Sequence, residues 1–184
     1  MTLLEETTDK LKEGKTILYP TDTVWGLGCD ASNSLAVKEI YKIKHREESK
    51  SLIVLVSSLH MLKKYVSVPP KALELIKKTT KPTTIIYNNP KGIASNIINK
   101  DDNTLAIRIV QDDFCRKLIK RFGKPIVSTS ANVSGNPTPK SFFQIEKAVL
   151  DSVDYIVNLH QEKVAEKSST IVKIEGKEVK VIRE

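Results

Sequence analysis

The stretch TILYPTDTVWGLGCDASNS, from Thr16 to Ser34, gives the clearest indication of the fold class. Its first residues form a short apolar run that ends at Tyr19, which predicts a buried strand, and Pro20 then predicts a turn. The Ser-Asn-Ser sequence around Asn33 is typical of a helix N-cap. A strand that gives way to a helix within one short stretch indicates an α/β fold.

The same alternation continues on both sides of this stretch. Helical periodicity is present at residues 3–13 and from Val37 to about Lys44, and helices are also predicted at 59–65, 70–78, 112–122 and 141–150. Apolar and β-branched runs predict strands at 52–56, 83–87, 104–110, 125–129, 155–158, 169–174 and 179–182. The late run of strands predicts a twisted, mixed parallel and antiparallel sheet with flanking helices. No linker or repeat divides the chain, so residues 1–184 are predicted to form a single domain.

Composition narrows the class of protein. With 184 residues, 40% of them hydrophobic and 28% charged, the chain is typical of a globular protein. No apolar stretch reaches the ~18 residues of a membrane span, and the first ten residues do not resemble a secretory signal, which predicts a cytoplasmic protein without a membrane partner. The two cysteines, Cys29 and Cys115, form neither a disulfide framework nor a zinc motif, and no metal site is predicted.

The chain carries 30 Lys and Arg against 22 Asp and Glu, a net charge of +8. Such an excess favours polyanionic partners, among them nucleotides and RNA. The densest basic run, RKLIKRFGK from Arg116 to Lys124, lies at the end of a predicted helix. A solvated helix face and a weak RNA contact both fit this run.

The glycines in WGLGCDA satisfy the pattern G-x-G-x-x-A, with Gly26, Gly28 and Ala31 after a predicted strand and before a predicted helix. A dinucleotide-binding turn and a plain tight turn both fit this pattern. The sequence has no P-loop, zinc-protease or nucleophile-elbow motif, so the ordinary P-loop and hydrolase classes are excluded.

Lys44, Arg46 and Lys50 lie within seven residues, where a predicted helix gives way to a loop. Their charged heads can converge on one anionic group, or they can form a solvated helix end that the helix dipole favours.

Polar side chains follow the strand predicted at 125–129. Strand ends of α/β sheets are common ligand sites, although a polar turn also fits. The residues concerned are Ser128, Thr129, Ser130 and Asn132.

Three motifs in this order resemble the signature of the YrdC-like threonylcarbamoyl-AMP synthase family: YPTDTVWGLGCD at Tyr19–Asp30, K-x-R at Lys44–Arg46, and S-x-N at Ser130–Asn132. The similarity extends over nearly the whole chain, through TLAIR at 104–108, SSTIV at 168–172 and VIRE at 181–184.

The resemblance implies roles for individual residues. The residues implied in L-threonine binding are Thr23, Arg108, Ser130 and Ser169. Those implied in ATP binding are Arg46, Lys50, Thr104, Asn132 and Arg183. The implied catalytic residues are the K-x-R and S-x-N pairs, which are Lys44, Arg46, Ser130 and Asn132.

The implied reaction joins L-threonine, bicarbonate and ATP, with Mg²⁺ accompanying the ATP, to give threonylcarbamoyl-AMP and pyrophosphate. The product would pass to a tRNA threonylcarbamoyl transferase that modifies adenosine 37 to N6-threonylcarbamoyladenosine. Two alternatives stay open at this point: a relative of the same fold with altered activity, and a non-catalytic RNA-binding module.

Overall fold

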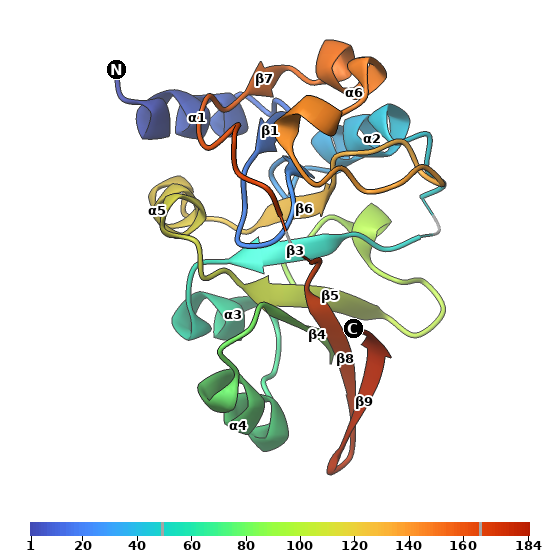
Figure 1. The fold of residues 1–184 in the computed structure, drawn as a ribbon. Helices are drawn as coiled ribbons and strands as arrows, with labels where there is room; N and C mark the ends of the chain where they lie inside the picture. Colours follow the sequence, from blue (N-terminus) through green and yellow to red (C-terminus); the bar gives the residue numbers. More distant parts are fainter. Residues whose placement is uncertain (49, 166) are drawn as a thin grey trace.

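The structure is a computed structural model that describes residues 1–48, 50–165 and 167–184 (Figure 1). Its strands are β1 (Ile17–Tyr19), β2 (Gly26–Gly28), β3 (Ile53–Val56), β4 (Thr83–Asn88), β5 (Thr104–Ile109), β6 (Ile126–Ser130), β7 (Tyr155–Ile156), β8 (Thr170–Glu175) and β9 (Glu178–Arg183). The α-helices are α1 (Leu3–Lys12), α2 (Ser34–Ile43), α3 (Leu59–Tyr65), α4 (Pro70–Lys78), α5 (Asp113–Phe122) and α6 (Lys147–Ser152). Two 3₁₀ helices, η1 (Ser95–Ile97) and η2 (Phe142–Gln144), complete the described elements.

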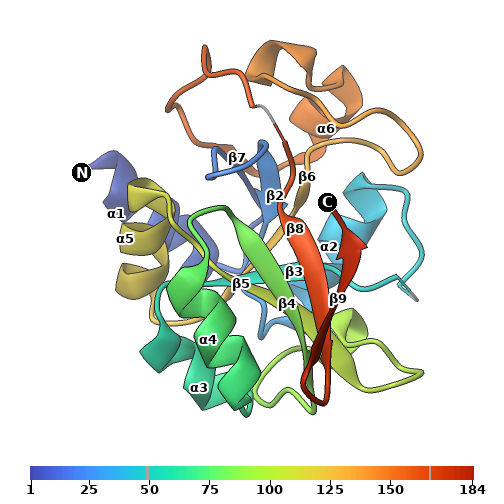
Figure 2. The same cartoon turned by 60° about the horizontal axis from the view of Figure 1, so that its bottom comes forward.

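The strands form one mixed sheet in the order β7-β1-β2-β6-β3-β5-β4-β8-β9. The pairs β1/β7, β3/β5 and β4/β8 are parallel, and the remaining neighbours are antiparallel. Figure 2 shows β4, β8 and β9 side by side at one end of the sheet. The predicted fold class, a mixed α/β sheet with flanking helices, is confirmed.

The helix boundaries follow from local capping. Thr2 forms a capping box with Glu5 at the start of α1, and the Asn33 side chain accepts hydrogen bonds from two backbone N–H groups at the start of α2. Asp112 caps α5, which ends at Gly123 with a left-handed φ of 81°. The caps at Asn33 and Asp112 and the helix end at Gly123 follow from residue type alone, whereas the Thr2 capping box was not predicted from the sequence.

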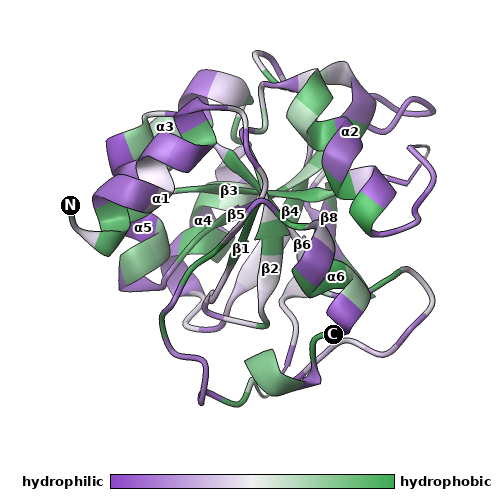
Figure 3. Cartoon of the chain, turned by 90° about the horizontal axis from the view of Figure 1, so that it is seen from above, coloured by the Kyte–Doolittle hydropathy of each residue, from purple (hydrophilic) through white to green (hydrophobic). Residues whose placement is uncertain are grey.

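Hydrophobic clusters lie on both faces of the sheet. The larger cluster includes Val37, Val54 and Leu62 and lies under α2, α3 and α6, while the smaller one includes Leu55 and Leu118 and lies under α1 and α5. Figure 3 shows α1 and α5 on one side of the strands and α2 and α6 on the other. Among the described residues, no helix is long and apolar enough to span a membrane.

Residues paired across neighbouring strands share one face of a sheet. The face that carries α1 and α5 is here called the groove face. Three pairs on it are Gly26 with Ser130, Ile53 with Ser128, and Leu55 with Arg108. Helices α1 and α5 cover only the Leu55 end of this face, which leaves a row of polar side chains accessible beside them.

Both interpretations of the G-x-G-x-x-A pattern are wrong, because Gly26 and Gly28 belong to strand β2, which is antiparallel to both of its neighbours. A Cβ atom on Gly28 would lie 2.4 Å from the carbonyl oxygen of Val127. The glycine is therefore required by the close approach of a neighbouring backbone, and not by a phosphate or a turn.

The helix predicted at 141–150 is also corrected. The chain forms the short η2, then an extended residue, Glu146, and then α6, which continues to Ser152. The Glu146 carboxylate accepts hydrogen bonds from the Val133 backbone N–H and the Asn136 side chain. These tertiary contacts override the helical periodicity at this position.

Residues 81–103 form β4 and the connection to its antiparallel partner β5. The connection contacts the rest of the molecule through Asn96, whose side chain donates to the Ser34 carbonyl and whose carbonyl accepts from the Tyr41 hydroxyl. The segment is therefore a hairpin with a tethered connection.

Candidate active site

A pocket of about 200 Å³ opens on the groove face. It is lined by three arginines and many hydroxyl groups, and no carboxylate belongs to its lining in the described part of the chain. Because a guanidinium keeps its charge at any ordinary pH, the pocket favours an anionic ligand. Eight of the residues selected from the sequence line it: Thr23, Arg46, Arg108, Ser128, Thr129, Ser130, Ser169 and Arg183.

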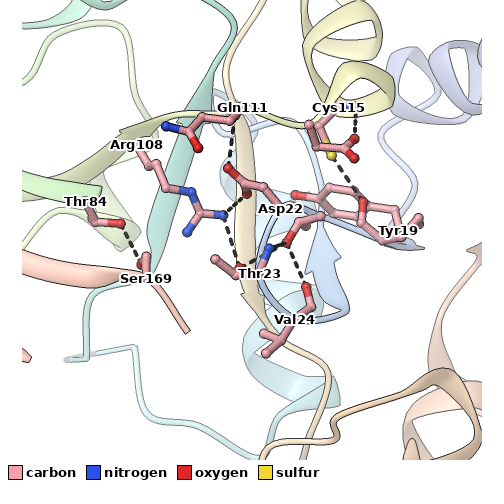
Figure 4. A network of polar contacts seen from close by, with 12 residues as sticks. Tyr19, Asp22, Thr23, Val24, Thr84, Arg108, Gln111, Cys115 and Ser169 are labelled. Atoms are coloured by element: carbon pink, nitrogen blue, oxygen red, sulfur yellow. Dashed lines mark hydrogen bonds and ion pairs between the residues drawn. The ribbon is translucent and has the colours of Figure 1, made fainter. Parts of the chain in front are cut away.

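Arg108 is anchored by Asp22, which lies in the turn between β1 and β2 (Figure 4). Arg108 is 3% exposed, and its Nη2 donates to Asp22 Oδ1 at 2.9 Å and to Thr23 Oγ1 at 3.4 Å. Asp22 Oδ2 accepts a hydrogen bond from the Gln111 backbone N–H at 3.0 Å. The buried Nε of Arg108 has no partner among the described residues, so it is left available for an acceptor on a ligand.

The position of Thr23 is set by Thr21. The Thr21 hydroxyl donates to the Val24 carbonyl at 2.8 Å and accepts from the Thr23 backbone N–H at 3.0 Å. The two threonine Oγ1 atoms are 3.0 Å apart. The turn is thus cross-linked by its own hydroxyls, and it presents the Thr23 side chain beside the Arg108 guanidinium (Figure 4).

Ser169 lies on the other side of Arg108 and connects two strands. Its hydroxyl is 2.9 Å from the Thr84 hydroxyl of β4, and its carbonyl accepts from Arg183 Nη2 at 2.9 Å. Burial, and secondly the positive charge of Arg108, lower the pKa of Arg183. An anion between the two guanidinium groups would offset their mutual repulsion.

Neither alternative for Lys44, Arg46 and Lys50 holds for all three residues, because they neither converge nor form one solvated helix end. Lys44 is 1% exposed, and its Nζ donates to the carbonyl oxygens of Ser130 at 2.6 Å and Asn132 at 2.8 Å. Lys50 is exposed and does not line the pocket. Helix α2 ends so that Lys44 points into the protein, and sequence spacing does not report that direction.

Arg46 lines the pocket, and its guanidinium donates hydrogen bonds to backbone carbonyl oxygens. Its Nη2 donates to the carbonyl oxygen of Ser51 at 3.1 Å. Its Nε lies 3.5 Å from the carbonyl oxygen of Lys50. The remaining guanidinium N–H groups have no hydrogen bond to the described residues. Arg46 is therefore the cation of the K-x-R pair that can contact a ligand.

Asn132 and Thr104 lie outside the pocket lining. The Asn132 side-chain amide donates to the carbonyl of Asn136 at 2.7 Å, so it stabilises the loop after β6. Thr104 donates to Asp102 Oδ1 at 2.6 Å. It shares the groove face of β5 with Arg108, about 13 Å further along the strand. A ligand that reaches both residues must be extended.

Sequence reasoning missed several residues of the site, among them Ser51, Thr138 and Asp22. Ser51 and Thr138 line the pocket from loops, and the sequence gives no signal for either. Asp22 anchors Arg108, and its place within the Tyr19–Asp30 motif was a signal that could have identified it. In the ranges 1–48, 50–165 and 167–184, no three His, Cys, Asp or Glu side chains gather to hold a metal ion.

The chain is similar to known proteins over nearly its whole length. The Sua5/YciO/YrdC family model, described as "Telomere recombination", matches residues 9–184. A protein from Methanocaldococcus jannaschii is 36% identical over 183 residues, covering 99% of this chain and 85% of that protein. The threonylcarbamoyl-AMP synthase of Vibrio vulnificus is 30% identical over 157 residues, which is 84% of each chain.

Among solved structures, P. abyssi Sua5 complexed with L-threonine superimposes with a TM-score of 0.86 at 26% sequence identity. The alignment covers 98% of this chain and 53% of the P. abyssi chain, so this chain spans about half of that protein. The family match over residues 9–184 and the relatives that share most of its length lead to one conclusion: the chain belongs to the Sua5/YciO/YrdC family.

Proposed function

We propose that this protein is a threonylcarbamoyl-AMP synthase, which makes threonylcarbamoyl-AMP and pyrophosphate from L-threonine, bicarbonate and ATP. The observation that carries the proposal is the pocket on the groove face, where Arg46, Arg108 and Arg183 gather without a lining carboxylate. Related proteins that cover most of this chain are named for this activity. A pocket with three fixed positive charges suits substrates that bring a carboxylate and a triphosphate.

L-Threonine binds at the Arg108 end of the pocket in this proposal. The unpartnered Nε of Arg108 donates to the amino-acid carboxylate, while Asp22 keeps the guanidinium in place from the opposite side. The hydroxyls of Thr23 and Ser169 lie on either side of Arg108 and bind the polar groups of the substrate. The related P. abyssi Sua5 has a solved structure in complex with L-threonine, which supports L-threonine as the ligand.

ATP extends from Arg46 and Arg183 along the groove face toward Thr104. Its phosphates neutralise the arginines that line the pocket. Mg²⁺ enters with the ATP as part of that substrate, held by phosphate oxygens and water, because the pocket lining supplies no carboxylate in the described residues. Lys44 acts behind the site by holding the Ser130–Asn132 loop.

The reaction needs no catalytic base to create the nucleophile that attacks ATP, because that nucleophile is an anionic carbamate oxygen. The threonine amine attacks the bicarbonate carbon, a proton from the amine passes to the departing hydroxide, which leaves as water, and a carbamate anion forms. A carbamate oxygen then attacks the α-phosphorus of ATP, and the bond from that phosphorus to the bridging oxygen breaks to release pyrophosphate. The arginines align the two anionic reactants and offset the charge of the departing pyrophosphate.

The product is a mixed anhydride, which water hydrolyses, so an acceptor must consume it promptly. In this proposal the consumer is a tRNA threonylcarbamoyl transferase that places the threonylcarbamoyl group on adenosine 37 of tRNA. A cytoplasmic location, where ATP and unmodified tRNA occur together, accompanies this assignment.

Pyrophosphate release from ATP is the direct test. The assay combines the purified protein with ATP, Mg²⁺, bicarbonate and L-threonine, and each component is omitted in turn. Release that requires L-threonine and bicarbonate together is expected, with L-alanine and L-serine as poorer substrates. Absence of release with every amino acid would reject the synthase and favour an altered relative or an RNA-binding module.

A further inference from the structure

The loop that follows β6 is held by side chains from two different helical segments. This loop, here called the S-x-N loop, runs from Ser130 to Thr138, and both of these residues line the pocket on the groove face. Lys44, at the end of α2, donates to the carbonyl oxygens of Ser130 and Asn132. Glu146, the residue before α6, contacts the next part of the loop. Helices α2 and α6 are in contact beside this segment (Figure 1).

The Glu146 carboxylate accepts two hydrogen bonds from the S-x-N loop. Its Oε1 accepts from the Val133 backbone N–H at 3.3 Å, and its Oε2 accepts from the Asn136 side-chain Nδ2 at 2.9 Å. The Asn136 backbone carbonyl in turn accepts from the Asn132 side chain at 2.7 Å. The carboxylate is therefore connected to the asparagine of the S-x-N motif through a single intervening residue.

Local structure does not account for the position of Glu146. The residue directly before a helix commonly caps it with its side chain, but Glu146 forms no such hydrogen bond to α6. In the described part of the chain it also forms no ion pair within 4.0 Å. The helical periodicity of residues 141–150 is interrupted at this glutamate, and the hydrogen bonds to the S-x-N loop are what the interruption provides.

We propose that Glu146 is a positioning residue of the synthase reaction, which holds the S-x-N loop in the arrangement that shapes the ATP end of the pocket. The inference rests on the proposed synthase activity and assigns to it a residue outside the three sequence motifs. Glu146 does not line the pocket, so it acts through the loop and not by contact with a substrate.

The threonine end of the pocket is anchored independently of this loop. Asp22 holds the Arg108 guanidinium, and the Thr84 hydroxyl contacts that of Ser169. Neither contact involves the S-x-N loop. A loop released from Glu146 should therefore impair the use of ATP and leave threonine binding largely unchanged.

Glu146 also places negative charge near the buried ammonium of Lys44. Burial, and secondly the positive charge of Arg46, lower the pKa of Lys44, and the negative charge of Glu146 opposes this shift. Arg46 from the adjacent loop and Glu146 from the start of α6 are the charged groups that act on Lys44, since the S-x-N loop presents only neutral carbonyl oxygens to it. Without the charge of Glu146, Lys44 should lose its proton at a lower pH than in the wild type.

Steady-state kinetics of pyrophosphate release test the inference with two substitutions. Glu146→Ala removes both hydrogen bonds to the loop, and kcat/KM for ATP should fall about tenfold while KM for threonine stays within about twofold of the wild type. Glu146→Gln keeps the side-chain length and an acceptor for the Val133 N–H, but it removes the charge. This variant should recover most of the activity near pH 7, and the alkaline limb of its kcat/KM profile should lie at lower pH than that of the wild type.

The matched control is Glu39→Gln, which removes the same charge from an exposed glutamate on α2 that pairs with Lys42. Its kinetic constants and alkaline limb should equal those of the wild type. Thermal unfolding of every variant is measured as well, because a merely structural glutamate would lower Tm without changing the kinetics well below Tm. That result would overturn the inference, and so would an unshifted alkaline limb in Glu146→Gln, which remains measurable if Glu146→Ala does not fold.

A second readout is independent of the proposed activity. An NMR titration of the lysine side-chain Cε resonances, with the Lys44 signal assigned by its absence in Lys44→Met, compares the wild type with Glu146→Gln. A lower Lys44 pKa in the variant supports the inference, and an equal pKa overturns it. Pyrophosphate release by the wild type with unaltered constants in both Glu146 variants would overturn the inference alone, whereas absence of release by the wild type would overturn the proposed function as well.

Discussion

Lys44 Nζ lies 2.6 Å from the carbonyl oxygen of Ser130, and this contact joins the two short motifs of the chain across 86 residues. The same amine donates to the carbonyl oxygen of Asn132. A buried ammonium with three donors is thereby satisfied by the backbone of the loop that follows β6. The K-x-R and S-x-N motifs thus form one unit, in which the lysine shapes the loop and the arginine faces the pocket.

Lys44→Met should therefore impair both stability and activity. The methionine fills similar space but leaves the carbonyl oxygens of Ser130 and Asn132 without their donor, a cost of about 1–3 kcal/mol. Urea unfolding should show the loss of stability, and pyrophosphate release should fall at least tenfold. Lys42→Met, an exposed lysine on the same helix, is the control and should change neither quantity. A Lys44→Met protein with full activity would contradict the positioning role.

Activity should decline as the pH rises through about 8. Burial, and secondly the positive charge of Arg46, lower the pKa of Lys44 to about 8 from its ordinary value of 10.5. A lowered lysine pKa means that the proton is lost earlier on the alkaline side, and the neutral amine then has one donor fewer for the loop. A profile of kcat/KM between pH 6.5 and 9.5 should show this alkaline limb, and an active Lys44→Arg variant should lack it.

Arg46→Ala should weaken the use of ATP more than that of threonine. The Arg46 guanidinium lines the pocket, and a charge-assisted phosphate contact contributes roughly 1.5–3 kcal/mol. The KM for ATP should rise or kcat should fall by about tenfold or more. Arg121→Ala removes an exposed arginine that pairs with Glu5 and should leave kinetics unchanged. An unaltered ATP dependence in Arg46→Ala would remove Arg46 from the proposed ATP site.

Arg108→Lys should raise the KM for threonine selectively. The lysine keeps the positive charge beside Asp22, whose side chain is 8% exposed, but it lacks the unpartnered Nε donor that Arg108 offers. Truncation to alanine is a poorer test, because an uncompensated Asp22 would cost about 3–5 kcal/mol of stability. Initial rates against each substrate separate the effects, and a defect confined to ATP would show that the two subsites are exchanged.

Gly28→Ala should destabilise the protein strongly. The added Cβ atom would meet the Val127 carbonyl oxygen at 2.4 Å, and both backbones belong to the centre of the sheet. Gly26→Ala is the matched comparison, since its nearest contact is the Ser128 hydroxyl at 3.1 Å. Thermal unfolding should give a lower Tm for Gly28→Ala than for Gly26→Ala, and equal values would refute the close-packing explanation.

The sequence predicted most elements to within a few residues because capping and apolar periodicity are local properties. The Asn33 cap, the Asp112 cap and the terminal Gly123 all appear where residue type alone places them. The error at 141–150 has a tertiary cause, as the Glu146 carboxylate is committed to the Val133 and Asn136 groups of another loop.

Local pattern alone thus determined the mixed α/β fold and the motifs from which the family could be recognised. Tertiary structure decided which side chains meet: it turned Lys44 away from the pocket and into the backbone of Ser130, and it brought Asp22 to Arg108 across 86 residues. The direction of a side chain depends on strand order and register, which arise from contacts between distant segments. The chemistry of the site therefore depends on how the strands pair as much as on which residues they contain.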